Sequence, residues 1–317
     1  MADACRRDHA FLAEDAKANT HDEMMVSGAF GFCRRRHARG LKGVDVAVVG
    51  VPFDTSVTNR PGTRFGPHAI RAASAQRGWA RAWPSDFDPF ERLSVVDRGD
   101  IHMPHGHPEL IPGHIEDAMS RIIWSGTTPL ALGGDHFTTF PSLRAHAAKL
   151  GRPVALIQFD AHTDTWAAES DWTDHGAVFR TAIEQGVIDP AASIAIGVRT
   201  TNDDQTGVEI WDAVRVHERG VQAAIDRISA WDRDAPCYIT FDIDRLDPAF
   251  APQTGTPVCG GLTSWQALAI LRGLAGLDVI GMDVVEVSPP YDVAEITALA
   301  GATIALQLLR PHAQRPK

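Results

Sequence analysis

Two aspartates stand one residue apart at the end of an apolar segment, a spacing that suits metal binding. Residues 237–241 read Cys-Tyr-Ile-Thr-Phe, and Asp242 and Asp244 follow with a single isoleucine between them. Residues i and i+2 of an extended strand point to the same side. Two carboxylates held together in a buried place repel each other unless a cation lies between them. The pair therefore predicts a divalent metal ion at this strand end.

Other side chains of metal-binding or catalytic type lie in or directly after three further apolar segments: His136, Asp160, His162, Asp164, Asp283 and Glu286. Taken singly, an aspartate after a strand is usually a turn former or a helix cap. The segment 160–164, however, places Asp, His and Asp at alternate positions, and unpaired buried charge costs free energy. The combined set therefore predicts one shared metal site.

The ligand types indicate the metal and the reaction. Two imidazoles and four carboxylates, with no thiolate, suit a hard or borderline ion such as Mn²⁺ better than a structural zinc ion. Six protein ligands also exceed what one catalytic zinc ion uses. We therefore expect two metal ions that share bridging carboxylates and convert a bridging water to hydroxide at neutral pH. The predicted reaction class is hydrolysis.

The elements that must position these residues alternate along the chain. Apolar runs predict strands at residues 44–53, 93–96, 129–132, 154–159, 193–198, 214–217, 237–241 and 279–285. Amphipathic or apolar segments predict helices through residues 70–73, 114–124, 140–150, 221–231, 263–274 and 294–309, the last ending before Pro311. Thr263 and Gln266 form a predicted capping box. This alternation predicts an α/β fold with a parallel sheet and helices on both faces.

Composition excludes some partners. The chain has 317 residues, with 40 acidic against 30 basic residues and a net charge of −10. This argues against nucleic acid and anionic membranes as partners and is compatible with a cationic substrate. The four cysteines show no CxxC spacing, and no apolar run approaches the ~20 residues of a membrane span. We expect a cytoplasmic protein with an N-terminal arm at residues 1–40 and a single domain at 41–317.

Six motifs resemble those of the ureohydrolase family, which contains the arginases and agmatinases, and most closely those of agmatinases. The similarity extends from about residue 50 to 309. The motifs are GGDHF at 133–137, FDAHTDTW at 159–166, DHG at 174–176, TFDIDRLDPAFAP at 240–252, TGTPVCGGL at 254–262 and DVVEVSPPYD at 283–292. The resemblance implies an arginase-like three-layer α/β/α sandwich with about eight mostly parallel strands. It also implies a homo-oligomer, a trimer or a hexamer.

The resemblance further implies a site with two Mn²⁺ ions per chain. One ion would bind His136, Asp160, Asp164 and Asp242; the other would bind Asp160, His162, Asp242 and Asp244. His175 matches the family histidine that moves protons to the leaving amine. Glu286 matches the carboxylate that pairs with the substrate guanidinium, and Thr256 is a further candidate for substrate binding. The implied reaction is the cleavage of agmatine to urea and putrescine through a metal-bridging hydroxide.

The sequence says less about which residues bind the tail of the substrate. Thr165-Trp166 after the DAHTD motif and Phe137 after GGDH depart from arginases and resemble agmatinases. Acidic loop residues are candidates for binding the agmatine ammonium: Asp171, Asp203 and Asp204. The alternative is a guanidino acid such as 4-guanidinobutyrate or 3-guanidinopropionate, whose carboxylate would need a cation such as Arg60 or Arg64.

Three further features leave alternatives open. Gln253 stands where agmatinases have glycine, which affects tail specificity or the loop of Thr256. The segment 101–109, with His102, His105 and His107, follows no ligand spacing and is expected to be a surface loop. A single-zinc deacetylase of related fold would need fewer carboxylates, and a regulatory homologue without activity would not need the intact ligand set.

Overall fold

The computed structural model describes residues 28–78, 83–84, 86–104, 106–167, 174–203, 206–230 and 235–314. Within them, eight strands form one sheet in the order β2-β1-β3-β8-β7-β4-β5-β6, and every neighbouring pair is parallel. The strands are β1 (Val46–Val51), β2 (Val95–Asp100), β3 (Thr128–Gly133), β4 (Ala155–Phe159), β5 (Ile194–Ile196), β6 (Glu209–Trp211), β7 (Cys237–Asp242) and β8 (Val279–Val285).

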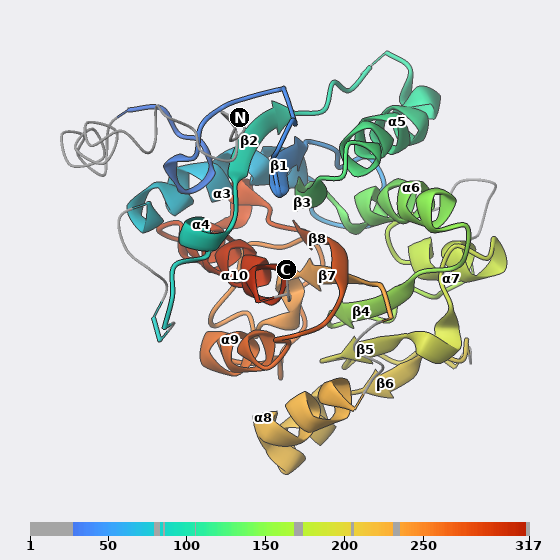
Figure 1. The fold of residues 1–317 in the computed structure, drawn as a ribbon. Helices are drawn as coiled ribbons and strands as arrows, with labels where there is room; N and C mark the ends of the chain where they lie inside the picture. Colours follow the sequence, from blue (N-terminus) through green and yellow to red (C-terminus); the bar gives the residue numbers. More distant parts are fainter. Residues whose placement is uncertain are drawn as a thin grey trace.

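Helices cover both faces of this sheet (Figure 1). They are α3 (Gly66–Ser74), α4 (Pro89–Arg92), α5 (Ile111–Trp124), α6 (Thr139–Leu150), α7 (Val178–Glu184), α8 (Ala213–Ser229), α9 (Ser264–Arg272) and α10 (Ile296–Ala313). Short 3₁₀ turns join them: η1 (Phe32–Arg34), η2 (Thr63–Phe65), η3 (Ala75–Arg77), η4 (Pro108–Leu110), η5 (His136–Thr138), η6 (Pro190–Ala192), η7 (Ile243–Arg245) and η8 (Pro289–Tyr291). Helices α5, α6 and α7 cover one face, and α3, α8, α9 and α10 the other.

Alternating strand residues form two separate cores, one under each helical layer. In β3, Leu130 and Leu132 pack into the core beneath α3, α8, α9 and α10, whereas Ala131 packs into the core beneath α5, α6 and α7. In β7, Ile239 packs into the first of these cores and Tyr238 into the second. Because successive side chains of a strand point to opposite faces, a strand buried on both sides is apolar throughout. The predicted three-layer α/β/α architecture is confirmed.

Two local predictions were wrong, and several elements were missed, among them α4 and β6. Residues 214–217 are not a strand but the first turns of α8, because the side chain of Asp212 accepts a hydrogen bond from the Arg215 N–H and caps the helix. Pro311 lies inside α10, which continues to Ala313. Helix α7 was not predicted. The capping box of Thr263 and Gln266 is confirmed at the start of α9.

The described end of the N-terminal segment packs on the edge of the sheet. Phe32 and Cys33 are fully buried, and the Phe32 N–H donates to Oδ2 of Asp97 in β2. The Cys33 N–H donates to the hydroxyl of Ser74 at the end of α3. These contacts tie η1 to both β2 and α3. No helix in the described part of the chain is long and apolar enough to span a bilayer.

Candidate metal centre

The carboxyl ends of three central strands bring all six predicted ligands together. β3 leads to His136, β4 to Asp160, His162 and Asp164, and β7 to Asp242 and Asp244. These strands and β8 are neighbours in the sheet. Loops after the carboxyl ends of parallel strands gather at one edge, which is where such sheets carry their functional residues.

The turn after β3 requires a glycine. A Cβ atom on Gly134 would lie 1.7 Å from the carbonyl oxygen of Phe53, so no larger residue fits while the backbones approach this closely. The Gly134 N–H donates to Val51 O, and the Asp135 N–H donates to Phe53 O. The loop after β1 is therefore held against the turn that carries His136.

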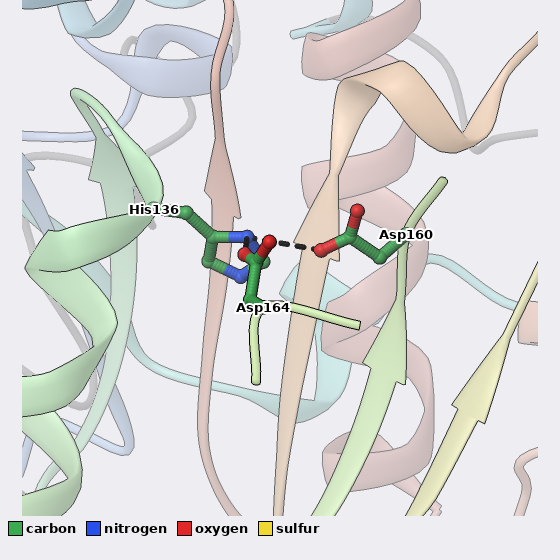
Figure 2. Close-up of side chains that lie close together, drawn as sticks. All are labelled: His136, Asp160 and Asp164. Atoms are coloured by element: carbon green, nitrogen blue, oxygen red, sulfur yellow. Dashed lines mark ion pairs between the residues drawn. The ribbon is translucent and has the colours of Figure 1, made fainter. Parts of the chain in front are cut away.

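His136 lies at the buried end of the ligand cluster. Its Nδ1 atom lies 2.8 Å from Oδ2 of Asp164 and 3.1 Å from Oδ2 of Asp160. Oδ2 of Asp242 lies 3.2 Å from the same nitrogen. Figure 2 shows the side chains of His136, Asp160 and Asp164 pointing toward one another. Nδ1 nevertheless meets the geometry of a hydrogen bond with no described residue. Its lone pair instead faces the centre of the carboxylates.

His162 lies at the more open end of the same cluster. Its Nδ1 atom lies 3.0 Å from Oδ2 of Asp244 and 3.4 Å from Oδ1 of Asp160. The His162 side chain is 15% exposed, against 1% for His136. Two groups of three could each hold an ion, one formed by His136, Asp160 and Asp164 and one by Asp160, His162 and Asp244. Asp160 is common to both groups and so lies where a bridging ligand would be.

Backbone and amide donors fix the carboxylates in place. Asp160 accepts hydrogen bonds from the His162 N–H at 2.7 Å and from the Gln158 side chain at 2.9 Å. Oδ1 of Asp242 accepts from the Asp244 N–H at 2.8 Å, and Oδ1 of Asp244 accepts from the Ala161 N–H at 3.1 Å. Each carboxylate thus keeps an oxygen directed into the cluster. The positions are preorganised before any ion binds.

A hydrogen-bond relay behind His136 determines which of its nitrogens faces the cluster. Nε2 of His136 lies 2.9 Å from the Thr240 hydroxyl, which donates to Oδ1 of Asp283 at 2.6 Å. Since the hydroxyl proton is given to Asp283, Thr240 must accept from Nε2–H. Thr139 and Tyr238 donate to the other Asp283 oxygen. When its ring is neutral, His136 is thereby held as the tautomer with a free Nδ1 lone pair, the form that binds a metal.

The buried carboxylates shift one another's pKa values. Burial raises the pKa of Asp242 well above its usual range, and the charges of Asp244 and Asp160 raise it further. Burial also raises the pKa of Asp164 to about 6, with the Asp160 charge acting in the same direction. Burial opposes ionisation of Asp160 too, but the neighbouring His136 and the other imidazole outweigh it and lower this pKa. Like charges this close cannot all ionise without positive charge among them.

The two imidazoles respond in the opposite direction. Burial lowers the pKa of His162, but Asp244 and Asp160 outweigh it and raise the pKa to about 12. The same balance holds the pKa of His136 well above its usual range, with Asp164 the largest raising charge. In the metal-free protein these nitrogens carry protons that a metal ion must displace, so metal affinity falls as pH falls. Oxygen and imidazole donors around an unsatisfied Nδ1 fit a Mn²⁺-type ion.

His175 and Glu286 lie together beside the cluster. Nδ1 of His175 is 2.8 Å from Oε1 of Glu286, which also accepts the His136 N–H at 2.9 Å. Nε2 of His175 accepts the Thr58 N–H at 3.1 Å, so the proton of the neutral ring is on Nδ1. Burial lowers the pKa of His175, but Glu286 outweighs it and raises the pKa to about 9. The Thr58 hydroxyl lies 2.8 Å from the same Nε2 and can accept from it when the ring is protonated on both nitrogens.

Glu286 keeps one oxygen unused. Its Oε2 atom is buried and has no hydrogen-bond partner among the described residues. The backbone of Glu286 is left-handed, with φ of 64°, and that of Asp164 has φ of 50°. Non-glycine residues adopt this conformation at a cost, and such strain gathers at functional sites. Thr256 lies close by, with its hydroxyl 3.5 Å from Oδ2 of Asp244.

Residues considered for the substrate tail have different surroundings. Arg64 pairs with Asp54, and the Arg60 guanidinium lies 5.4 Å from the centre of the Tyr291 ring. Gln253 is fully buried rather than exposed at an opening, and its side-chain amide has no hydrogen-bond partner among the described residues.

The remaining sequence candidates lie on the surface or outside the described residues. Asp203 is exposed, and so are His102 and His107 of the predicted surface loop. Asp171, Asp204 and His105 lie outside the described residues.

Sequence reasoning missed the Thr240–Asp283 relay and the contact of Thr58 with His175. A signal for Thr240 was present, since i and i+2 spacing puts it on the same side of β7 as Asp242. Asp283 was noted within an apolar segment, yet its role depends on the pairing of β7 with β8, which sets Thr240 opposite Asp283. Thr58 had no local signal, because its contact joins residues 117 positions apart.

Comparison with known proteins gives consistent matches over the described fold. Residues 44–310 match the model of the Arginase family. The chain is 51% identical over 288 residues to an agmatinase of Chromobacterium violaceum, covering 90% of this chain and 89% of that protein. A crystal structure of a hypothetical agmatinase from Burkholderia thailandensis is 50% identical with a TM-score of 0.90, covering 92% of this chain and 93% of that one. Proclavaminate amidino hydrolase from Streptomyces clavuligerus is 36% identical with a TM-score of 0.86, covering 92% and 99%.

Proposed function

The chain belongs to the arginase family and is a ureohydrolase, a hydrolase of guanidino groups, and from this premise we propose that it cleaves agmatine to urea and putrescine. The observation that carries the proposal is the convergence of two imidazoles and four carboxylates on one buried cluster, with Asp160 common to both candidate ion positions.

The proposed cofactor is a pair of Mn²⁺ ions. His136, Asp160, Asp164 and Asp242 would hold one, and Asp160, His162, Asp242 and Asp244 the other. Bound there, the ions would lower the pKa of a water molecule and so supply a nucleophile at neutral pH. The unsatisfied Nδ1 of His136 and the mutual repulsion of the carboxyls support this assignment.

The chain's own residues position the substrate. A guanidinium is a planar group of N–H donors, and the free Oε2 of Glu286 is the carboxylate oxygen that can accept from it. Oε1 already accepts from the His136 N–H and from His175, so a bidentate hold needs Oε1 to take a third donor. We assign to Glu286 the orientation of the guanidinium beside the ligand cluster. We assign to Thr256 a contact with the same group, supported by its hydroxyl lying 3.5 Å from Oδ2 of Asp244.

His175 is the proposed proton donor. When the carbon–nitrogen bond to the leaving amine breaks, that nitrogen needs a proton. His175 is buried beside Glu286, and its pKa is raised to about 9, so it holds a proton at neutral pH. Its Nδ1 faces Glu286 and thus the place assigned to the guanidinium.

Agmatine is preferred over a guanidino acid because the two arginines considered for a carboxylate tail are engaged elsewhere. Arg64 pairs with Asp54, and Arg60 lies over Tyr291. The agmatine tail ends in an ammonium, which the net charge of −10 favours. The identity of 51% to an agmatinase adds to this argument. A guanidino acid stays the second candidate substrate, since its hydrolysis needs the same metal ligands.

Urea release tests the proposal. The Mn²⁺-loaded protein is incubated with agmatine, arginine, 4-guanidinobutyrate and 3-guanidinopropionate, and bound manganese is counted per chain. We expect two ions and a kcat/KM for agmatine at least about 100-fold above the others, the discrimination that a buried unpaired charge gives. Preference for a guanidino acid would leave the proposed metal centre in place and overturn the proposal of agmatine as the substrate. No urea from any guanidine would overturn the function.

We also propose the wider organisation of the protein. Residues 41–317 would form a single catalytic domain and residues 1–40 an arm, part of which packs on β2 and α3. A trimer or hexamer is proposed from the family resemblance. A cytoplasmic location is proposed from the four cysteines, whose spacing includes no CxxC pair. Sedimentation of the purified protein tests the oligomer.

A further inference from the structure

A basic cavity lies at the edge of the sheet, away from the ligand cluster. Its volume is about 620 Å³, and its lining includes Arg39, Arg98, Arg121, His102 and His114. Arg98 belongs to β2, the edge strand, which is separated from β3 by β1. None of the lining residues is a proposed ligand of the metal centre. The cavity is thus separate from the metal centre.

The cavity wall is built from β2, α5 and the segment that joins them, with Arg39 and Pro52 added from either side of β1. On α5, His114, Ala118 and Arg121 follow one another at spacings of four and three, which puts them on one helix face. The segment after β2 adds the apolar side chains of Ile101 and Met103, both buried. The cavity therefore combines a cationic part with an apolar part.

The arginines of this cavity lack partners. In the described ranges, no side-chain hydrogen bond or ion pair involves Arg39, Arg98 or Arg121, and Nε of Arg98 is buried without an acceptor. Asp100 is the acidic residue in the lining, but its Oδ1 accepts from Arg71 at 2.5 Å. Three guanidinium groups thus share a cavity without a counter-charge committed to them.

The three like charges repel one another, with Arg98 half-buried and Arg39 and Arg121 exposed at the rim of the cavity. Burial lowers the pKa of Arg98, and the charges of Arg121 and Arg39 lower it further. Like charges within a cavity disfavour one another. The chain as a whole has a net charge of −10, so a local cluster of unpaired cations runs against the general composition. An anion that binds all three groups would remove the repulsion.

We propose that this cavity binds a phosphorylated small molecule, with its phosphoryl oxygens on Arg39, Arg98 and Arg121. Planar guanidinium groups match phosphate oxygens in pairs, and several phosphoryl charges balance three arginines better than one carboxylate does. The volume is that of a small-molecule site rather than of a single ion. The less polar part of the ligand packs on Ile101 and Met103.

Calorimetric titration with pyrophosphate, ADP, inorganic phosphate and citrate tests the proposal on the Mn²⁺-loaded protein. We expect pyrophosphate and ADP to bind more tightly than inorganic phosphate, and affinity to fall as salt rises. Arg98→Gln and Arg121→Gln should each weaken pyrophosphate binding by about tenfold or more, as expected for a lost charge-assisted contact. Arg152→Gln, which removes an exposed arginine elsewhere, should leave the affinity unchanged.

The variants separate this site from the metal centre. Any binding of pyrophosphate to manganese is the same in all three variants, so only a loss confined to Arg98→Gln and Arg121→Gln supports the proposal. Equal affinity in every variant, or no heat from pyrophosphate and ADP, overturns it. The proposal is also overturned if citrate binds as tightly as pyrophosphate or if Arg121→Gln changes the oligomeric state. Either result would indicate that the arginines bind carboxylates of a second copy of the chain. Urea release is unaffected in either case.

Discussion

Two histidines with almost the same burial have opposite surroundings. His136 is 1% exposed and faces three carboxylates, while His146 in α6 is 2% exposed and packs edge-on to the Tyr238 ring, with centroids 5.3 Å apart. Burial lowers the pKa of His146 to about 3, so it is neutral. Burial has the same effect on His136, but Asp164 and its neighbours outweigh it and raise the pKa.

The difference shows what turns a core histidine into a candidate ligand. Each ring is linked to the same buried carboxylate through one other residue. His136 reaches Asp283 through Thr240, and His146 packs on Tyr238, which donates to Asp283. For His146, Nε2 has no hydrogen-bond partner among the described residues. Burial makes a histidine inert; the relay behind it and the carboxylates in front of it make it ready for a metal ion.

Removing one carboxylate in front of His136 is expected to have the largest effect. Asp242→Asn takes charge from both proposed ion positions, so bound manganese should fall below two per chain and urea release should drop by about 1,000-fold or more, as for loss of an essential catalytic group. Elemental analysis and a urea assay measure this. Asp117→Asn, an exposed change on α5, is the control. Near-normal turnover with two ions would contradict the proposed ligand set.

A charge beside the ligand cluster that does not face Nδ1 of His136 is expected to affect the substrate and not the metal. Glu286→Gln removes the negative charge next to His175 while the acceptor for the His136 N–H is retained. We expect manganese content to stay at the wild-type value and kcat/KM for agmatine to fall by about 100-fold, the cost of a charged hydrogen bond to substrate. Loss of manganese in this variant would instead make Glu286 part of the metal-binding set.

Removing the relay should make His136 more like His146. Thr240→Val deletes the acceptor for Nε2–H and leaves the carboxylates in place, so manganese affinity should weaken by about 10- to 100-fold. Equilibrium dialysis of manganese measures this without turnover. Thr240→Ser retains the hydroxyl and should restore most of the affinity. If valine and serine variants bind manganese equally, the relay does not hold the tautomer.

The smallest effect is expected at His146 and appears as pH dependence of stability. Its folded-state pKa, about 3, is below the ordinary histidine value of 6.5, so the unfolded chain binds a proton that the folded chain does not. Stability is therefore full above pH 6.5 and is lost as pH falls toward 3. Between pH 7 and pH 5 this amounts to about 2 kcal/mol.

Denaturation by urea at pH 7 and pH 5, with a chelator to remove metal, measures that loss. His146→Gln removes the titrating group, so the wild type should lose about 2 kcal/mol more than the variant over this interval. The other groups titrate equally in both proteins. An identical loss of stability in the two proteins would show that His146 takes up its proton in the folded chain over the same pH range as in the unfolded chain.

The alternation of elements and the metal motifs were readable from the sequence because their signals are local. Asp160, His162 and Asp164 are spaced within one strand end, and Thr263 with Gln266 caps α9 within four residues. Strands such as β7 and β8 were predicted close to their observed bounds, because an apolar run identifies a strand buried on both faces. The ligand types themselves indicated a metal and a hydrolysis.

Tertiary structure decided what depends on residues far apart in the chain. The order β3-β8-β7-β4 sets Thr240 opposite Asp283, and the loop after β1 sets Thr58 on His175. No local pattern contains these pairings. Residues 214–217 were misread because a short alternating run is ambiguous until the Asp212 cap is seen. Likewise Arg39, Arg98 and Arg121 share a cavity only because the fold brings the segment before β1, the edge strand β2 and helix α5 to the same place.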